Sequence, residues 1–393
     1  MGNRVAAVGR WRDFASRRAR HVHDLGEVLL LPGLVNAHCH LDYTNMAGML
    51  PPQNSFADWI KLITSTKAEW VFGDYRESWL HGASMLLRTG TTTVGDIEAV
   101  PDLLPEVWMA TPLRVISFLE MTGIRARRSP ESVLAEAVDK IAELPEGRCQ
   151  AGLSPHAPYS TLPELLQRCA TLGRQRGWPL TTHVAESREE YEMIRHRRGP
   201  MFQWLRRNER DMSDCGLGTP VQHLHRAGLL RSNLLAVHAN YLAPGDPQLL
   251  ARFGVSVAHC PRSHAYFRHR RFPLRRLLRA GVNVCLGTDS LATVRKRPRQ
   301  PIELSLFEEM QELANRETWL RPRRIVEMAT VNAAWALGRA GQVGELSEGS
   351  LADLIALPYT GSRAQAWEAA VQHQGRVTAS MIDGQWACVP NAA

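Results

Sequence analysis

Short apolar segments alternate with longer amphipathic segments along most of the chain. The apolar segments are rich in Val, Ile and Leu and end in polar residues, which is typical of buried parallel strands. The predicted strands are Leu34–His38, Thr92–Ile97, Arg114–Phe118, Gln150–Ser154, Leu180–His183, Leu234–His238, Val255–Ala258 and Val282–Leu286. Helices are predicted between them, for example over Pro130–Glu143, Leu162–Arg176, Pro247–Phe253 and Leu274–Ala280. Eight strands alternating with helices predict an α/β fold, a closed (β/α)8 barrel (TIM barrel) of parallel strands.

The two ends of the chain follow another pattern. Beyond Gln342 the segments are short and are separated by turn residues such as Gly344 and Gly349, which indicates β-structure rather than more barrel. Near the N-terminus, Arg4–Gly9 also resembles a strand. We therefore predict a barrel over residues 32–340 and a small accessory β-sandwich-like domain formed by residues 1–31 and 341–393.

Composition and charge exclude several classes of protein. The net charge is +8, but only four of the 47 basic residues are lysines, and the arginines are scattered without interleaved aromatic residues. This pattern argues against nucleic-acid binding. No apolar run approaches the roughly 18 residues that a membrane span needs. The expected partner is a small-molecule substrate, with no nucleic acid and no membrane.

The cysteines and the N-terminus bear on the cellular compartment. The chain has seven cysteines and no C-x-x-C pair. Such isolated cysteines within apolar segments are typical of a reducing compartment. The N-terminus lacks the apolar core of a signal peptide. These features predict a cytoplasmic protein.

Residues suited to chemistry follow the predicted strands where the strands end. His38 and His40 are two residues apart at the end of the first strand, so both side chains are expected on one face, as zinc or iron ligands. In a barrel, the carboxyl ends of all strands converge on one mouth. Residues far apart in the sequence are therefore predicted to meet there.

Three further strand ends carry candidate residues. His183 ends the fifth predicted strand, and Glu186 follows three residues later. His238 ends the sixth strand, and Asp289 follows the eighth. Taken singly, His238 could be a core histidine and Asp289 a helix cap, but their coincidence at the correct strands favours a metal site. His156, after the fourth strand, is a candidate for contacting the substrate.

Several sequence motifs together resemble those of the amidohydrolase superfamily. They cover the chain in order: PGLVNAHCHLD, GTTTVGD, THVAE, VHAN, LGTDS, ATVNAAWALG and GSLADL. The resemblance is closest to the branch that contains guanine, adenosylhomocysteine and aminodeoxyfutalosine deaminases and the triazine hydrolases. It implies one divalent metal ion, zinc in preference to iron, and a homodimer is common in this branch.

The resemblance also implies roles for the candidate residues. The implied metal ligands are His38, His40, His183 and Asp289. The implied catalytic residues are Glu186 as a proton shuttle, His238 as a hydrogen-bonding partner of the reactive water, and Asp289. The fourth predicted strand, Gln150–Ser154, contains no lysine that could bridge a second metal, which favours a mononuclear site.

The chain departs from the family pattern where substrate would be recognised. His264 stands where asparagine is usual, and the loop over residues 292–301 is longer and more basic than usual. Arg262, Arg271 and Arg295 are candidates to contact a carboxylate on the substrate. The expected reaction is hydrolytic deamination of an amino-substituted purine nucleoside or related heterocycle. Hydrolysis of a cyclic amide or a chloro-triazine at the same site is an alternative, and so is a catalytically silent barrel that binds a ligand.

Overall fold

The computed structural model describes residues 2–14, 22–123, 128–296 and 302–389. Eight parallel strands form a sheet in the order of the sequence, which confirms the predicted barrel. They are β2 (Leu34–Cys39), β3 (Thr91–Glu98), β4 (Arg114–Met121), β5 (Gln150–Pro155), β6 (Leu180–Val184), β7 (Leu234–His238), β8 (Ser256–His259) and β9 (Val284–Leu286). The predicted strands match these within a few residues at each end.

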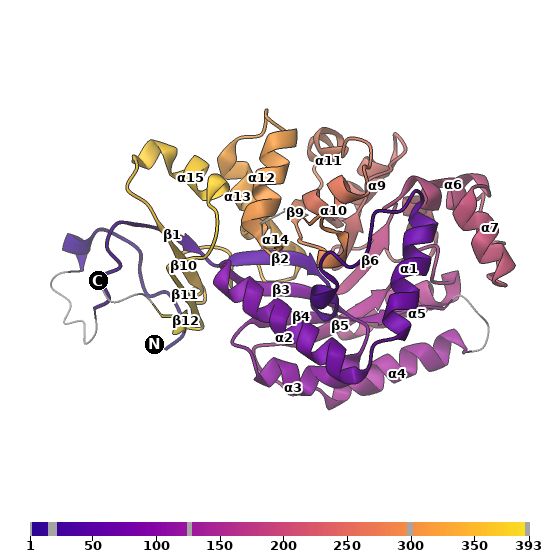
Figure 1. Ribbon diagram of the computed structural model, residues 1–393, viewed down its shortest axis with the longest axis horizontal. Coiled ribbons are helices and arrows are strands. Elements are labelled where there is room, and N and C mark those ends of the chain that lie inside the picture. The colour runs from indigo at the N-terminus through magenta and orange to yellow at the C-terminus, as the bar shows by residue number, and fades with distance from the viewer. Residues whose placement is uncertain (1, 15–21, 124–127, 297–301, 390–393) are drawn as a thin grey trace.

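Helices surround the barrel and cover its outer face (Figure 1). They are α1 (Phe56–Ala68), α2 (Phe72–Arg88), α3 (Leu104–Met109), α4 (Pro130–Glu143), α5 (Pro163–Arg176), α6 (Arg188–His196), α7 (Pro200–Arg207), α8 (Pro220–Arg226), α9 (Asp246–Arg252), α10 (Pro261–Tyr266), α11 (Leu274–Ala280), α12 (Leu306–Arg316), α13 (Pro322–Met328), α14 (Val331–Ala336) and α15 (Ala366–Gln372). Short 3-10 helices are η1 (Trp11–Asp13), η2 (Leu41–Met46), η3 (Pro101–Leu103), η4 (Leu291–Thr293) and η5 (Arg363–Gln365). No helix in the described parts of the chain is long and apolar enough to cross a membrane.

The first and last barrel strands are joined by side-chain and backbone hydrogen bonds. The Asn36 amide donates to Thr288 Oγ1 at 2.8 Å, and its oxygen accepts from the Thr288 backbone at 3.1 Å. Beside it, the backbone N–H of Asp289 donates to the carbonyl of His38 at 3.1 Å. These contacts close the barrel next to its first histidine, so they help fix the distance between residues at the two ends of the sheet.

Side chains on the strands alternate between the barrel interior and the helix layer. On β4, Ile116 and Phe118 pack in one buried cluster with Leu337, which follows α14. Their neighbours Val115 and Leu119 pack in another, which includes residues of the surrounding helices. This alternation follows from the two-residue period of a strand. It is the reason that polar side chains at strand ends can point into a common mouth.

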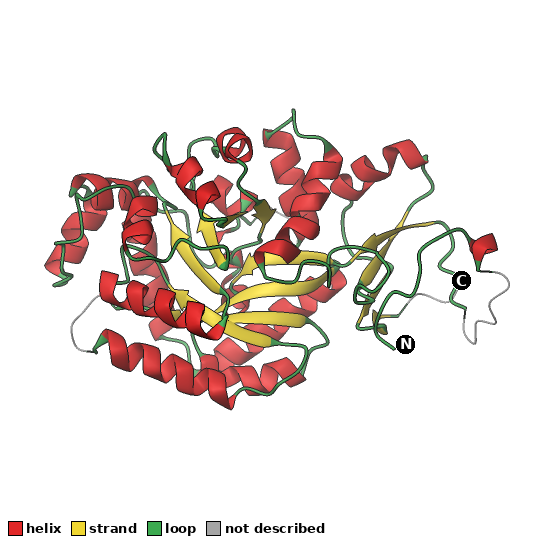
Figure 2. Cartoon of the chain, turned by 180° about the vertical axis from the view of Figure 1, so that it is seen from behind, coloured by secondary structure: helices red, strands yellow, loops and turns green. Residues whose placement is uncertain are grey.

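Both ends of the chain contribute to a small separate sheet beside the barrel (Figure 2). It is antiparallel, with the order β1 (Val28–Pro32), β10 (Leu354–Pro358), β11 (Ala379–Ile382) and β12 (Gln385–Cys388). The strand expected over Arg4–Gly9 is reduced to a single bridge between Arg4 and Leu351. The accessory sheet predicted from both termini is thus present, and the exact domain boundaries stay a prediction.

Candidate active site

Four histidines and an aspartate meet at the carboxyl ends of the barrel strands. The potential ligand atoms of His38, His40 and His183 all lie within 4.8 Å of one another. The same holds for His38, His238 and Asp289. Every one of these residues is buried. The structure therefore brings together the four residues predicted as metal ligands, with His238 beside them.

The spacing of these atoms suits one tetrahedrally coordinated ion. The Nε2 atoms of His40 and His183 are 3.3 Å apart, and Asp289 Oδ1 lies 3.5 Å from His38 Nε2. Bonds of about 2.0–2.1 Å in a tetrahedral zinc site place ligand atoms roughly 3.3 Å apart. Both ring nitrogens of His38 are buried without a hydrogen bond, which is costly unless another partner binds them. Three imidazole nitrogens and one carboxylate oxygen fit a divalent ion such as zinc.

Contacts behind the ligands hold them in the required orientation. His183 Nδ1 lies 3.1 Å from the backbone carbonyl of His156, so it donates there and leaves Nε2 free as a ligand. A Cβ atom at Gly287 would lie 2.8 Å from the Cβ atom of His38, so only glycine fits next to that imidazole. His238 and Asp289 have positive φ angles of 72° and 54°. Such strain in residues other than glycine is concentrated at functional sites.

The electrostatics of the cluster keep His40, His183 and His238 neutral and the aspartate ionised. Burial lowers the pKa of His40 and of His238 to about 3 in each case. Burial alone would raise the pKa of Asp289, but the ring N–H groups of the histidines around it, His38 first, hold it well below its usual range. Neutral imidazole and ionised carboxylate are the forms that bind a metal ion.

Glu186 is positioned beside this cluster by the loop after β6. Its Oε1 atom lies 3.6 Å from His238 Nε2, and its side chain is buried. Glu190 accepts the backbone N–H groups of Ala185 and Glu186, each at 2.9 Å, and so fixes the loop. Burial, followed by the nearby charges of Asp289 and Glu190, raises the pKa of Glu186 well above its usual range. A carboxyl group in this state can hold a proton and release it to a reacting group.

His156 lies next to the metal cluster but outside it. Its ring centre is 4.9 Å from that of His183, and its Nδ1 atom is 2.5 Å from Ser160 Oγ. Its Nε2 atom is 3.7 Å from Glu120 Oε1. This position, between the ligands and the surrounding loops, is consistent with the predicted contact to a substrate.

Three residues of the mouth were not singled out in the sequence. Glu120 is the last residue but one of β4 and is largely buried. Tyr43 stacks on the His40 ring at 5.4 Å between centres, and its hydroxyl contacts the ammonium group of Lys67 from α1. Glu120 and Tyr43 could have been found from their positions near the carboxyl ends of β4 and β2. Lys67 had no such signal, because it lies within an amphipathic helix whose orientation only packing defines.

Two of the three arginines predicted to contact substrate, Arg262 and Arg295, occupy different surroundings. Arg262 is buried on α10, where its guanidinium pairs with Glu308 and Glu309 and donates to the backbone carbonyl of Glu303 at 3.0 Å. Arg295 is exposed and follows η4, close to Asp289 in the chain. The rest of the basic loop, residues 297–301, lies outside the described residues. A substrate role for either arginine stays a prediction.

The barrel and its cluster of buried ligands define a metal-dependent hydrolase. The chain belongs to the amidohydrolase family, whose model matches residues 29–387. This match spans the barrel and most of the accessory sheet, as the motifs in the sequence indicated.

Relatives and solved structures extend this likeness over nearly the whole chain. A 5-methylthioadenosine/S-adenosylhomocysteine deaminase of Syntrophobacter fumaroxidans is 31% identical over 91% of this chain and 79% of its own. The zinc-bound adenosine deaminase of Xanthomonas campestris is 25% identical, with a TM-score of 0.76 over 92% of this chain and 81% of its own. An aminofutalosine deaminase of Helicobacter pylori has a TM-score of 0.84 over 98% of this chain and 93% of its own. Because this last pair is 21% identical, the similarity shows that the two chains share a fold.

Proposed function

We propose that this protein hydrolytically deaminates an adenosine-like nucleoside and releases ammonia. The observation that carries the proposal is the metal-ligand cluster with Glu186 beside it, in a chain that is 31% identical to a methylthioadenosine/adenosylhomocysteine deaminase. The ion would be zinc, in preference to iron, held by His38, His40, His183 and Asp289. It would supply Lewis acidity that lowers the pKa of water from 15.7 to about 7.

The residues around the cluster orient the water and transfer protons during the reaction. Asp289 and His238 orient the attacking water, since their polar atoms lie within 4.8 Å of each other and of His38. Glu186 takes one proton from that water and gives it to the ring nitrogen as the new C–O bond forms. It then moves the remaining hydroxyl proton to the amine, so that the C–N bond breaks and ammonia leaves. Its raised pKa suits both steps, because a buried carboxyl group holds a proton more readily than an exposed one and can pass it to a reacting group.

The neighbouring residues suit recognition of a nucleoside. Burial would raise the pKa of Glu120, but His156 and Lys67 outweigh this effect and lower it, so the carboxylate is ionised. An ionised carboxylate accepts hydrogen bonds from sugar hydroxyls. His156 is neutral, since burial lowers its pKa, and it can donate to or accept from the purine ring. Aminodeoxyfutalosine and thio-adenosines are the leading substrates.

The first test is ammonia release by zinc-loaded protein. The panel contains aminodeoxyfutalosine, S-adenosylhomocysteine, methylthioadenosine, adenosine and guanine. We expect ammonia from at least one purine nucleoside, loss of activity after chelation, and recovery on adding zinc. If no compound of the panel releases ammonia while one metal ion is bound, hydrolysis of a cyclic amide or a chloro-triazine would be favoured. A chain that binds no metal would favour a silent binding protein.

We predict that Arg295 raises affinity for substrates that carry a carboxylate. Arg295→Ala should raise KM about tenfold for aminodeoxyfutalosine, which corresponds to roughly 1.4 kcal/mol, and leave KM for methylthioadenosine within about twofold. The matched control is Arg174→Ala, an exposed arginine in the last turn of α5. Equal effects of Arg295→Ala on charged and neutral substrates would refute this role.

The location and the oligomeric state belong to the same proposal. The cysteine pattern supports a cytoplasmic protein, and all seven cysteines are free in the structure. A homodimer is the expected assembly. Size-exclusion chromatography with light scattering tests that expectation directly.

A further inference from the structure

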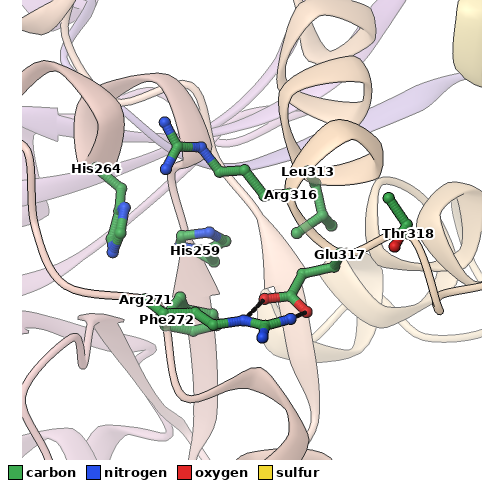
Figure 3. A pocket seen from close by; sticks show the side chains of 8 residues that line it. All are labelled: His259, His264, Arg271, Phe272, Leu313, Arg316, Glu317 and Thr318. Atoms are coloured by element: carbon green, nitrogen blue, oxygen red, sulfur yellow. Dashed lines mark hydrogen bonds and ion pairs between the residues drawn. The ribbon is translucent and has the colours of Figure 1, made fainter.

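A second cavity lies outside the barrel interior, behind β8. Its volume is about 500 Å³, which lies within the range of roughly 300–1,000 Å³ for small-molecule sites. Figure 3 shows the side chains around it, contributed by β8, α10, the segment before α11 and the end of α12. The lining residues are His259, His264, Arg271, Phe272, Leu313, Arg316, Glu317 and Thr318.

The alternation of side chains along β8 separates this cavity from the metal cluster. Ala258 and Cys260 belong to the cluster that fills the barrel interior. Val257 belongs to the cluster of the helix layer, and His259 faces the same way. The His259 ring stacks on Phe272 with 3.8 Å between ring centres. The cavity is therefore a site of its own and not an extension of the mouth.

Two buried imidazoles in the wall have polar atoms without hydrogen bonds. His259 Nδ1 is fully buried and forms none. The His264 ring interacts with the backbone of Arg270, which leaves at least one of its two buried nitrogens without a partner. The two residues are only 2% and 4% exposed. Burial of such groups is costly unless a partner satisfies them, so these nitrogens point to a ligand. Among the described residues, the groups whose side-chain atoms lie close enough together to hold a metal ion do not include His259 or His264.

Two ion pairs surround the cavity, and one of them leaves guanidinium N–H groups available to an anion. Arg271 and Glu317 form a two-point ion pair, at 3.0 and 2.6 Å, which neutralises the carboxylate. Arg316 is only partly engaged, through its Nε atom, by Glu312. Burial, together with the nearby charge of Arg316, keeps His264 neutral and lowers its pKa to about 4. A neutral imidazole still offers one N–H donor, and a guanidinium suits an oxyanion.

We propose that this cavity binds a small organic oxyanion, a carboxylate or a phosphate, at a site distinct from the metal centre. The oxyanion accepts hydrogen bonds from Arg316 and His264. The apolar part of the ligand lies against Phe272 and Leu313. Because β8 separates the two sites, binding here does not require that the deaminase activity proposed above be correct.

Calorimetric titration of zinc-loaded protein tests the site. The probes are benzoate, inorganic phosphate and the neutral analogue benzamide. We expect one equivalent of benzoate or phosphate to bind, with the tighter of the two identifying the oxyanion, and benzamide to bind at least tenfold more weakly. Arg316→Gln and His264→Asn should each weaken oxyanion binding at least tenfold. The control Arg324→Gln, an exposed arginine on α13 paired with Glu327, should leave it unchanged.

Two outcomes would overturn the proposal. One is oxyanion binding that is equal in Arg316→Gln and in the unchanged protein, since Arg316 is half-exposed and its loss should not impair folding. The other comes from a crystal soaked with para-bromobenzoate. Bromine found at the metal centre alone would assign the binding to the active site, whereas bromine beside Phe272 would support the second site.

Discussion

Replacing Glu186 by glutamine should lower kcat by about 100- to 10,000-fold without changing the zinc content. Glutamine keeps the size and shape of the side chain but cannot carry a proton between water and the substrate. Glu186 lies beside His238 and is not part of the ligand set, so the metal should stay bound. The measurements are the ammonia-release rate at saturating substrate and the metal content by elemental analysis.

Separate values of kcat and KM distinguish a role of Glu186 in proton transfer from a role in binding the substrate. A residue that moves a proton acts in the transition state, so KM should change little. Glu164→Gln, an exposed glutamate on α5 paired with Arg168, is the matched control and should retain full activity. Full activity of the Glu186→Gln variant with zinc bound would show that another group moves the proton.

The second large effect should be on stability, at the junction between the barrel and the small sheet. Arg114 on β4 is buried and pairs with Asp353 at 3.3 Å and Asp383 at 2.7 Å. Asp353 is fully buried. Arg114→Met removes the cation and leaves that carboxylate unpaired, which costs about 3–5 kcal/mol at such sites. Urea unfolding of the zinc-loaded protein measures the loss.

Two further variants separate the loss of the ion pair from a general loss of folding. Arg128→Met breaks an exposed pair with Glu136, and it should change the free energy of unfolding by less than about 1 kcal/mol. Arg114→Met combined with Asp353→Leu removes both charges and should recover much of the stability, because an apolar pair needs no compensation. An Arg114→Met variant as stable as the Arg128→Met control would contradict the argument.

The candidate metal ligands could be predicted because they lie at the carboxyl ends of three barrel strands, β2, β6 and β9. His38, His183 and Asp289 are far apart in sequence, yet parallel strands of a barrel deliver their ends to one mouth. Arg262 illustrates the limit of that reasoning. Its place after β8 suggested a contact with substrate, but the pairing partners on α12 come from a distant segment whose position the sequence does not reveal.

Other features depend on packing between segments that have no shared pattern. Lys67 reaches Tyr43 because α1 folds over the mouth, and no periodicity predicts that contact. The cavity behind β8 needs His259 to face outward and α12 to lie opposite it. Both conditions depend on the orientation of a strand and a helix that are about fifty residues apart.

The sequence by itself determined the number and order of the barrel strands, the accessory sheet at the ends, and the residues at each strand end. These are local properties, since hydrophobic period and strand length are encoded within short segments. Only the tertiary structure decided which ring nitrogens stay unpaired, which arginines are already neutralised, and where a second cavity forms. Those properties depend on distances between side chains of different elements, and such distances arise only when the elements pack.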